Sequence, residues 1–319
     1  MKLNSSNLLC LMIMFMSTMM SLMVNNWLFM WILMEINLFM FMPLMSKKKI
    51  NDQSIKYFII QSFSSHLLIF SMLMVSISLT PSKNSLLVMI SLIMKIGMAP
   101  FHLWMPELMT KMSWNECFLL TSPLKITPMI LISKLTSMKL MLTPMMLSLL
   151  TGSLSGLNQT CLKKVMAFSS IFNLTWMASS FFFSKKMMLL FLVIYSTLTI
   201  KIMFFFKKMN IQFMNQINQL ELNKSVKINL MVLSISGLPP MMGFFPKWMI
   251  LKEMSVTSNI MCFLMITTSM LSMFMYIQIN SISFSNFAMK KKNLMNNKIK
   301  SFSSINLIYI PVSLIFWLN

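Results

Sequence analysis

The sequence contains no arginine and is poor in acidic residues, glycine, alanine and cysteine. Only five of its 319 residues are glycines, and neither a glycine-rich phosphate loop nor a dinucleotide-binding fingerprint is present. Its serines lack a neighbouring base and acid, so the sequence does not support a hydrolase. Its two histidines lie on different predicted helices, which excludes a multi-haem cytochrome. These absences exclude nucleotide-binding, hydrolytic and multi-haem enzymes.

The four cysteines are too widely separated to form a metal site. No CxxC pair occurs, and the spacing fits neither a zinc site nor an iron–sulfur centre. We expect Cys10, Cys117, Cys161 and Cys262 to be ordinary buried thiols. The chain is therefore expected to hold no metal.

Hydrophobic residues make up 57% of the chain and charged residues only 10%, whereas a soluble domain is about 45–50% apolar and about 25% charged. Apolar runs long enough to cross roughly 30 Å of hydrocarbon as helices occur about eleven times. They lie near residues 5–24, 27–45, 57–79, 85–104, 116–133, 140–157, 165–183, 187–206, 229–251, 255–279 and 301–318. The sequence therefore predicts an all-α polytopic membrane protein without a soluble domain.

Most of the charged residues are lysines: there are 27, against six acidic residues, and the net charge is +21. In a soluble protein this excess would indicate nucleic-acid binding, but here the lysines gather in loops on one side. If the predicted spans alternate in direction, the side that holds the N-terminus collects 17 lysines and the opposite side six. By the positive-inside rule, the N-terminus faces the compartment of synthesis and the C-terminus faces away from it. No nucleic-acid partner is expected.

Residue usage indicates where the chain is encoded. Methionine occurs 44 times and phenylalanine 27 times, and isoleucine, asparagine and lysine are also frequent. These residues have A/T-rich codons, and such a high methionine content follows if AUA is read as methionine. The methionines are spread through every predicted span, which does not fit a methionine-rich binding surface. The composition therefore indicates an AT-rich animal mitochondrial genome.

Two of the predicted spans contain helix breaks next to a lysine. The first reads "KIGMAPFHLW" from Lys95, and the second reads "SGLPPMMGFFPKW" with Lys247 near its end. The residues expected to break the helices are Gly97, Pro100, Gly237, Pro239, Pro240 and Gly243. Interrupted segments at corresponding positions of two halves indicate a transport site in an inverted-repeat carrier. The alternative is that proline simply kinks two membrane helices, which is common.

The spacing of the two breaks predicts an internal repeat. Five spans separate them, so each break falls in the fourth helix of a five-helix unit, and an odd number of helices inverts the second unit. We predict a first repeat over residues 1–135, a second over 138–280 and a closing helix over 301–319.

Four charged residues within the predicted spans are candidates for proton transfer: Glu35, Lys95, Lys125 and Lys247. A charge at a helix centre costs at least about 2.5–3.5 kcal/mol, so each needs a partner, water or a function. A desolvated lysine can release its proton, whereas arginine effectively cannot. A carboxylate at about 4 Å attracts the charged form by about 4 kcal/mol at an effective dielectric constant of about 20. Moving Glu35 relative to a lysine would therefore switch that lysine between holding and releasing a proton.

Structural roles remain open for these residues. Glu35 can serve as a counter-ion only, and Lys125 can be solvated by backbone carbonyls freed by Pro123 and Pro128. Lys247 can extend its stem to the membrane surface. His66, on a predicted span that also carries Gln61 and several serines, either lines a water-filled proton path or makes hydrogen bonds between helices.

Three stretches resemble one family: "MKIGMAPFHLWMPE" (94–107), "GLNQTCLKKVMAFSSI" (156–171) and "GLPPMMGFFPKW" (237–248). They are similar to the second mitochondrially encoded chain of NADH:ubiquinone oxidoreductase, respiratory complex I, in its shortened animal form. The resemblance covers nearly the whole chain and weakens after about residue 255. It implies an antiporter-like membrane-arm subunit of the mitochondrial inner membrane, with the N-terminus in the matrix and the C-terminus in the intermembrane space.

The resemblance also implies a function and partners. The subunit is expected to take part in proton translocation coupled to NADH oxidation and quinone reduction elsewhere in the complex. No cofactor is expected on this chain, because other subunits handle the flavin, the iron–sulfur clusters, NADH and ubiquinone. Its expected partners are other membrane-arm subunits, including neighbouring antiporter-like subunits, and lipids.

Individual roles follow from the same resemblance. Glu35 matches the glutamate that pairs with the lysine before the first break, here Lys95. Lys125 matches the lysine at the junction of two half-channels, and Lys247 matches the lysine of the second broken helix, which leads toward the next antiporter-like subunit. Asn173 replaces a histidine found in many members, and asparagine can bridge waters on a polar path but cannot titrate.

The chain departs from the family at a second point, where Pro123 and Leu124 replace the common Trp-Gln before the central lysine, so a stronger local kink is expected. Two other functions remain open on the residues alone. A free-standing cation/proton antiporter would work in isolation, and a purely structural membrane-arm subunit would use its buried charges only to hold its neighbours in register.

Overall fold

The computed structural model describes residues 5–45, 52–77, 81–239 and 241–290. Within these ranges the chain is helical, apart from connecting turns and one isolated β-bridge between Cys161 and Phe213. Pro240 and the closing helix expected over 301–319 lie outside the described residues. The chain divides into two compact units, Met1–Ser148 with Asn173–Phe182 (unit 1) and Leu149–Phe172 with Phe183–Asn319 (unit 2).

Eight helices in the described part of the chain are long and apolar enough to cross a membrane. They are Ser5–Met23, Trp27–Met45, Asp52–Ile77, Trp114–Leu135 (two consecutive helical segments taken together), Met138–Leu157, Leu162–Phe183, Lys185–Lys208 and Asn259–Ser281. Each overlaps one predicted span. Two predicted spans that lie within the described residues are absent from this set, those near 85–104 and 229–251, and they are the two that carry the breaks. The all-helical class is confirmed.

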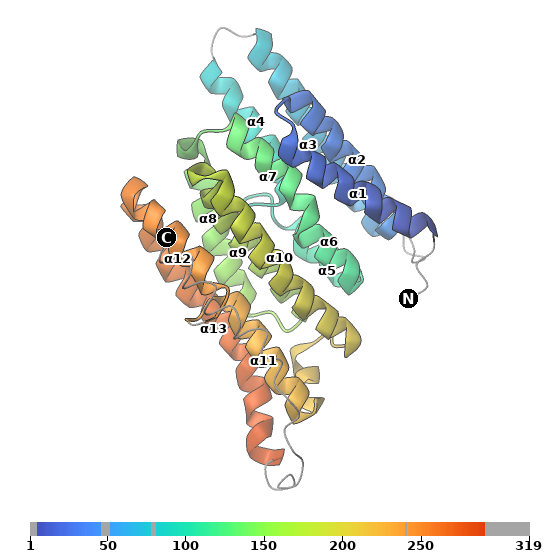
Figure 1. The fold of residues 1–319 in the computed structure, drawn as a ribbon, viewed down its shortest axis with the longest axis vertical. Helices are drawn as coiled ribbons and strands as arrows, with labels where there is room; N and C mark the ends of the chain where they lie inside the picture. Colours follow the sequence, from blue (N-terminus) through green and yellow to red (C-terminus); the bar gives the residue numbers. More distant parts are fainter. Residues whose placement is uncertain (1–4, 46–51, 78–80, 240, 291–319) are drawn as a thin grey trace. The chain divides into compact units, whose positions relative to one another are not determined.

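Unit 1 is built around one central helix. Its helices are α1 (Ser5–Met23), α2 (Trp27–Met45), α3 (Asp52–Ile77), α4 (Pro81–Ile96), α5 (Trp104–Lys111), α6 (Trp114–Thr121) and α7 (Pro123–Leu135). The central helix, α7, packs against α1, α2, α4 and α6, and α3 packs along α4 (Figure 1). Residues of α2, α3, α4 and α7 are thereby brought together although they are far apart in the sequence.

The predicted span over 116–133 is two helical segments rather than one. α6 ends at Thr121 and α7 begins at Pro123, with Ser122 between them at φ −120° and ψ −79°. Pro123 has no N–H with which to continue the hydrogen-bond ladder, and its ring disfavours a helical conformation for the residue before it. The stronger kink expected here takes the form of an interruption three residues before Lys125.

Unit 2 contains α10 (Lys185–Lys208), the 3₁₀ helix η1 (Met214–Gln219), α11 (Leu222–Ser236), α12 (Phe244–Thr257) and α13 (Asn259–Lys290). α13 packs against α11, α12 and η1, and α10 packs against α11 and α12. Two further helices, α8 (Met138–Leu157) and α9 (Leu162–Phe183), contribute residues to both units.

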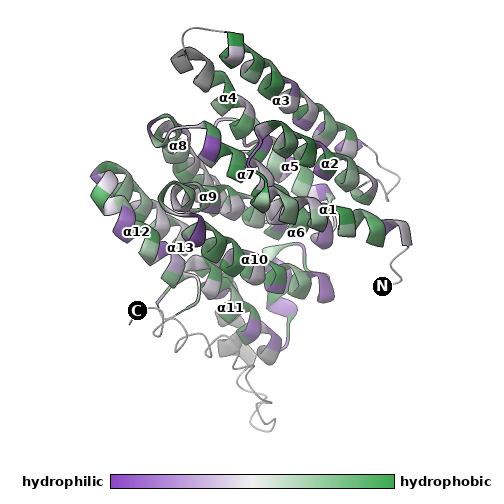
Figure 2. Ribbon diagram, turned by 45° about the horizontal axis from the view of Figure 1, so that its top comes forward, coloured by the Kyte–Doolittle hydropathy of each residue, from purple (hydrophilic) through white to green (hydrophobic). Residues whose placement is uncertain are grey.

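The outer faces of the helices are apolar. On α1, Met12, Phe15, Met16 and Met19 are each exposed by about half or more of their surface, and Figure 2 shows hydrophobic residues predominating along this helix. Contiguous apolar surface of this kind marks a membrane or protein contact. Polar side chains instead gather inside: on α3, Gln61, Ser64 and Ser65 are buried.

Candidate functional site

The first break lies where α4 ends at Ile96. Gly97 follows at φ +79°, and its N–H donates to the Ile93 carbonyl at 2.9 Å. A side chain is disfavoured at this φ, and a Cβ would lie 2.9 Å from Cζ2 of Trp104. Glycine is therefore required for the helix to end here with Trp104 packed against its terminus.

The break leaves backbone carbonyls of the last helical turn without partners inside the helix. One of them, the carbonyl of Lys95, accepts a hydrogen bond from Nε2 of Gln61 at 3.0 Å. Gln61 is buried on α3. The Gln61 side chain therefore links α3 to the broken end of α4 through the backbone of Lys95.

Glu35 and Lys95 form an ion pair between α2 and α4. Nζ of Lys95 donates to Oε1 of Glu35 at 2.9 Å, and the two side chains are 4% (Lys95) and 17% (Glu35) exposed. The structure thus brings together the two charges that the family resemblance pairs. The ion pair keeps the lysine charge compensated inside an apolar helix bundle.

Lys125, on α7, is buried without a carboxylate. Its Nζ lies 3.7 Å from Sδ of Met105, and no oxygen atom of the described residues accepts a hydrogen bond from it. Thioether sulfur is a weak acceptor. The proposed solvation by carbonyls freed at Pro123 and Pro128 is not formed among the described residues, so the Lys125 ammonium depends on other acceptors.

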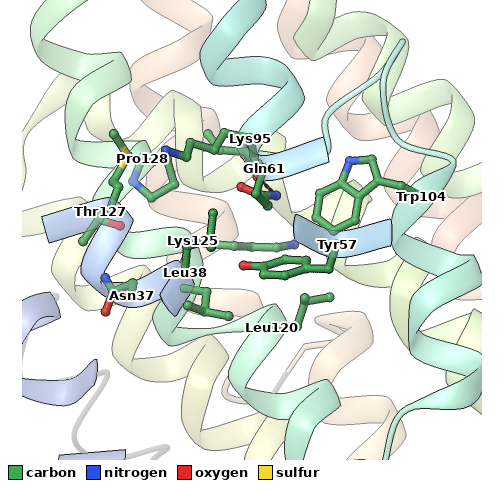
Figure 3. Close-up of a pocket in the computed structure, with 13 residues that line it drawn as sticks. Asn37, Leu38, Tyr57, Gln61, Lys95, Trp104, Leu120, Lys125, Thr127 and Pro128 are labelled. Atoms are coloured by element: carbon green, nitrogen blue, oxygen red, sulfur yellow. Dashed lines mark hydrogen bonds between the residues drawn. The ribbon is translucent and has the colours of Figure 1, made fainter. Parts of the chain in front are cut away.

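A cavity in unit 1 is lined by both Lys95 and Lys125 (Figure 3). Its lining residues are Met34, Asn37, Leu38, Tyr57, Gln61, Lys95, Ile96, Trp104, Leu120, Leu124, Lys125, Thr127 and Pro128. The volume open to the centres of water molecules is about 30 Å³, and a water needs roughly 10–15 Å³ on this measure. The cavity therefore has room for about two waters beside Lys95 and Lys125.

Several polar groups of this cavity were not among the predicted site residues. Asn37, buried on α2, accepts a hydrogen bond from the Ser17 hydroxyl through Oδ1, while its Nδ2 has no partner among the described residues. Nε1 of Trp104 likewise has none in the described part of the chain. One signal was present in the sequence, because Tyr57 and Gln61 are four residues apart and so share one face of a helix.

Two predicted polar-path residues are placed elsewhere. His66 lies on an exposed face of α3, and its Nδ1 is 2.6 Å from the Ser62 carbonyl of the same helix. It does not line the cavity. Asn173 is buried in the middle of α9. A role for either residue in a proton path stays a prediction.

The second break separates α11 from α12. Gly237 caps α11 at φ +82°, in the left-handed conformation, and Gly243 precedes α12. A Cβ on Gly243 would lie only 2.1 Å from the Ser234 carbonyl oxygen. Gly243 therefore allows the start of α12 to lie directly against the last turn of α11. Pro239 lies between the two glycines, in the connecting segment.

Lys247 turns inward toward this break. Its Nζ donates to the Ser236 carbonyl at 2.9 Å and lies 3.5 Å from the Ile235 carbonyl. It also lies 5.5 Å from the ring centroid of Phe172. Carbonyls at a helix C-terminus and an aromatic face both attract a cation. With Lys247 only 8% exposed, the ammonium does not extend to the surface of the unit.

The described residues contain no group of three or more histidine, cysteine, aspartate or glutamate side chains that could hold a metal ion. None of the four cysteines forms a disulfide bond within the described residues. Only Cys117 is fully buried, whereas Cys10, Cys161 and Cys262 are half-buried, so the expectation of four buried thiols holds for one of them. The polar groups around the two breaks are lysines, the partly buried carboxylate of Glu35, amides, hydroxyls and backbone carbonyls.

Residues 24–275 match the family model described as "NADH:quinone oxidoreductase/Mrp antiporter, TM". NADH-ubiquinone oxidoreductase chain 2 of Locusta migratoria is 39% identical over 87% of this chain and 85% of its own length. The protein of the same name from Anopheles gambiae is 35% identical over 98% of this chain and 96% of its own length. Among solved structures, a chain of respiratory complex I from Thermus thermophilus with bound aureothin has a TM-score of 0.79 at 16% identity, over 98% of this chain and 77% of that one.

Proposed function

The chain belongs to the family of NADH-ubiquinone oxidoreductase chain 2, and from this membership we infer that it is a membrane-arm subunit of respiratory complex I that takes part in proton translocation. It is therefore part of an enzyme, NADH:ubiquinone reductase, while the redox chemistry takes place on other subunits. Those subunits hold the flavin and the iron–sulfur clusters. Its own contribution is to move protons through a membrane-embedded helical domain.

The proposed architecture has eleven spans, arranged as two inverted five-helix repeats and a closing helix. The two breaks support this arrangement, because each ends a helix at a left-handed glycine and has a buried lysine close by. The proposed location is the mitochondrial inner membrane, with the N-terminus in the matrix and the C-terminus in the intermembrane space. Neighbouring antiporter-like subunits and lipids are the proposed partners, and the apolar outer faces of α1 and α3 are suited to such contacts.

One observation carries the proposed mechanism: the Glu35–Lys95 ion pair lies next to a cavity that Lys95 shares with Lys125. Redox energy released elsewhere in the complex perturbs the ion pair. When the carboxylate moves away, Lys95 loses its counter-charge in a desolvated site and releases its proton. Lys125, which has no carboxylate partner among the described residues, accepts a proton from the cavity side.

Lys247 is the proposed next group in this sequence of transfers. Its ammonium is held by carbonyls at the end of α11, which stabilise the charged form without a carboxylate. A small shift between α11 and α12 would lengthen these hydrogen bonds and weaken the hold on the proton. The helix breaks would thereby supply backbone carbonyls whose distance to a buried lysine can change.

The test is Lys125→Met in assembled complex I reconstituted into proteoliposomes. The substitution keeps most of the side-chain volume and removes the ammonium. We expect proton pumping per assembled complex to be lost, whereas Lys139→Met, at an exposed lysine of α8, should leave it unchanged. A normal pumping rate and a normal proton-to-electron stoichiometry in Lys125→Met would refute the mechanism. A fall in assembly with normal pumping per complex would instead support a purely structural role.

A further inference from the structure

We propose that the hydroxyl of Tyr57 carries the proton between Lys95 and Lys125, with Gln61 as the side chain that positions this path. The proposal rests on the proposed function, because it names the group that links two lysines of the same transfer path. It assigns a proton-carrying role to α3, a helix without a titratable group at this cavity other than Tyr57.

Three hydrogen-bond donors on residues that line the cavity lack an acceptor oxygen in the described part of the chain. Nε1 of Trp104, Nδ2 of Asn37 and Nζ of Lys125 have no oxygen acceptor among the described residues. A buried donor without an acceptor costs about 1–3 kcal/mol. The site is therefore complete only when water or a hydroxyl supplies acceptor oxygens, and Tyr57 is the phenol that borders the cavity.

Tyr57 is held firmly at the cavity wall. The side chain is 4% exposed, and its ring packs edge-on against Phe41 at 5.2 Å between centroids and lies 6.2 Å from the ring of Trp104. Its hydroxyl has no hydrogen-bond partner among the described residues, so both its proton and its lone pairs are available to water in the cavity.

Figure 3 shows Lys95, Gln61, Lys125 and Tyr57 around the same cavity. Lys125 extends across the cavity to the side of Tyr57, and the amide of Gln61 lies between Lys95 and this pair. The hydrogen bond from Gln61 Nε2 to the Lys95 carbonyl fixes the amide, so its oxygen can orient bridging water. Tyr57 and Gln61 are one helical turn apart on α3 and follow the same wall of the cavity.

The transfer step conserves atoms and charge. An N–H bond of the Lys95 ammonium breaks, and the proton passes through a bridging water to the Tyr57 oxygen. As this O–H bond forms, the original O–H bond of Tyr57 breaks and its proton goes to the neutral amine of Lys125, directly or through the second water. Lys95 ends neutral, Lys125 ends charged, and rotation of the hydroxyl restores Tyr57.

The test compares Tyr57→Phe with Tyr276→Phe, in complex I assembled with each variant and reconstituted into proteoliposomes. Both substitutions keep the ring and remove one buried hydroxyl, and Tyr276 lies on α13 of unit 2. Positioned proton transfer typically contributes a factor of about 10²–10⁴. We expect Tyr57→Phe to slow NADH-driven pumping per assembled complex at least tenfold, and Tyr276→Phe to change it less than about twofold.

A second readout separates proton transfer from packing. In Tyr57→Phe the proton step becomes rate-limiting, so the ratio of pumping rates in H₂O and D₂O should rise above the wild-type ratio. A packing defect would lower the assembled amount and leave this ratio unchanged, and that result would refute the relay. Normal pumping in Tyr57→Phe, with pumping lost in Lys125→Met, would also refute it while the proposed function stands. Normal pumping in both variants would overturn the proposed function itself.

Discussion

Replacing Glu35 by glutamine removes one charge and keeps the shape of the side chain. Nζ of Lys95 lies 2.9 Å from Oε1 of Glu35, and at an effective dielectric constant of about 20 the attraction at this distance is about 6 kcal/mol. The glutamine oxygen still accepts a hydrogen bond from the ammonium, which recovers about 1.5–3 kcal/mol. The expected loss is therefore about 3–4 kcal/mol, within the range for breaking a buried ion pair.

The exposed fractions of the two side chains predict an asymmetry between their single substitutions. Lys95 is 4% exposed and Glu35 17%, so an unpaired lysine ammonium would be less hydrated than an unpaired carboxylate. Glu35→Gln should therefore destabilise the complex more than Lys95→Met. The double variant, which removes both charges, should be more stable than Glu35→Gln alone, because no buried charge is left unpaired.

The measurement is the rate at which assembled complex I loses NADH:quinone reductase activity at a fixed elevated temperature. If a loss of about 3 kcal/mol in stability lowered only the barrier to inactivation, the inactivation rate would rise roughly a hundredfold. We expect this rate to rise at least tenfold in Glu35→Gln. The amount of assembled complex, read from native gels, normalises each rate. The reasoning fails if Glu35→Gln is as durable as the wild type, or if the effects of the single variants simply add in the double variant.

Two further predictions concern the glycines at the breaks. In Gly97→Ala, the alanine has to adopt φ +79°, and its Cβ lies 2.9 Å from Trp104. The backbone strain should cost about 1–2 kcal/mol and the overpacking about 1–3 kcal/mol. We therefore expect a lower yield of assembled complex. A wild-type yield would show that Trp104 moves freely. Gly243→Ala places a Cβ 2.1 Å from the Ser234 carbonyl oxygen, and this overpacking should cost about 3 kcal/mol. We expect faster thermal inactivation than in Gly156→Ala, where the closest contact of the new Cβ is the flexible Met275 side chain; equal rates would contradict the close packing of α12 on α11.

Much of the site was visible in local sequence features. Glu35, Lys95, Lys125 and Lys247 stand out because a charge inside an apolar run is costly and therefore rare. The breaks stand out because glycine and proline alter the backbone wherever they occur. The pairing of Glu35 with Lys95 came from the family resemblance, since partners 60 residues apart cannot be matched by spacing alone.

Other features depended on which helix faces meet. His66 and Gln61 are both polar residues of α3, yet Gln61 points into the cavity while His66 is exposed. Nothing in the order of residues distinguishes the two until α4 and α7 are packed in place. The sequence predicts only a kink near Ser122, whereas the structure has a full interruption between two helices. The position of a proline is visible in the sequence, but the size of the backbone deviation that it causes is not.

The sequence by itself determined the membrane class, eight of the spans, the two breaks and the buried charges, because hydropathy, proline and glycine act over one or two helical turns. The tertiary structure alone decided what surrounds each charge. It gave Lys95 a carboxylate, left Lys125 beside a cavity and turned Lys247 toward the carbonyls of α11. The physical reason is that a buried charge is stabilised by groups within a few ångströms, and distant segments of the chain supply those groups only after the helices pack.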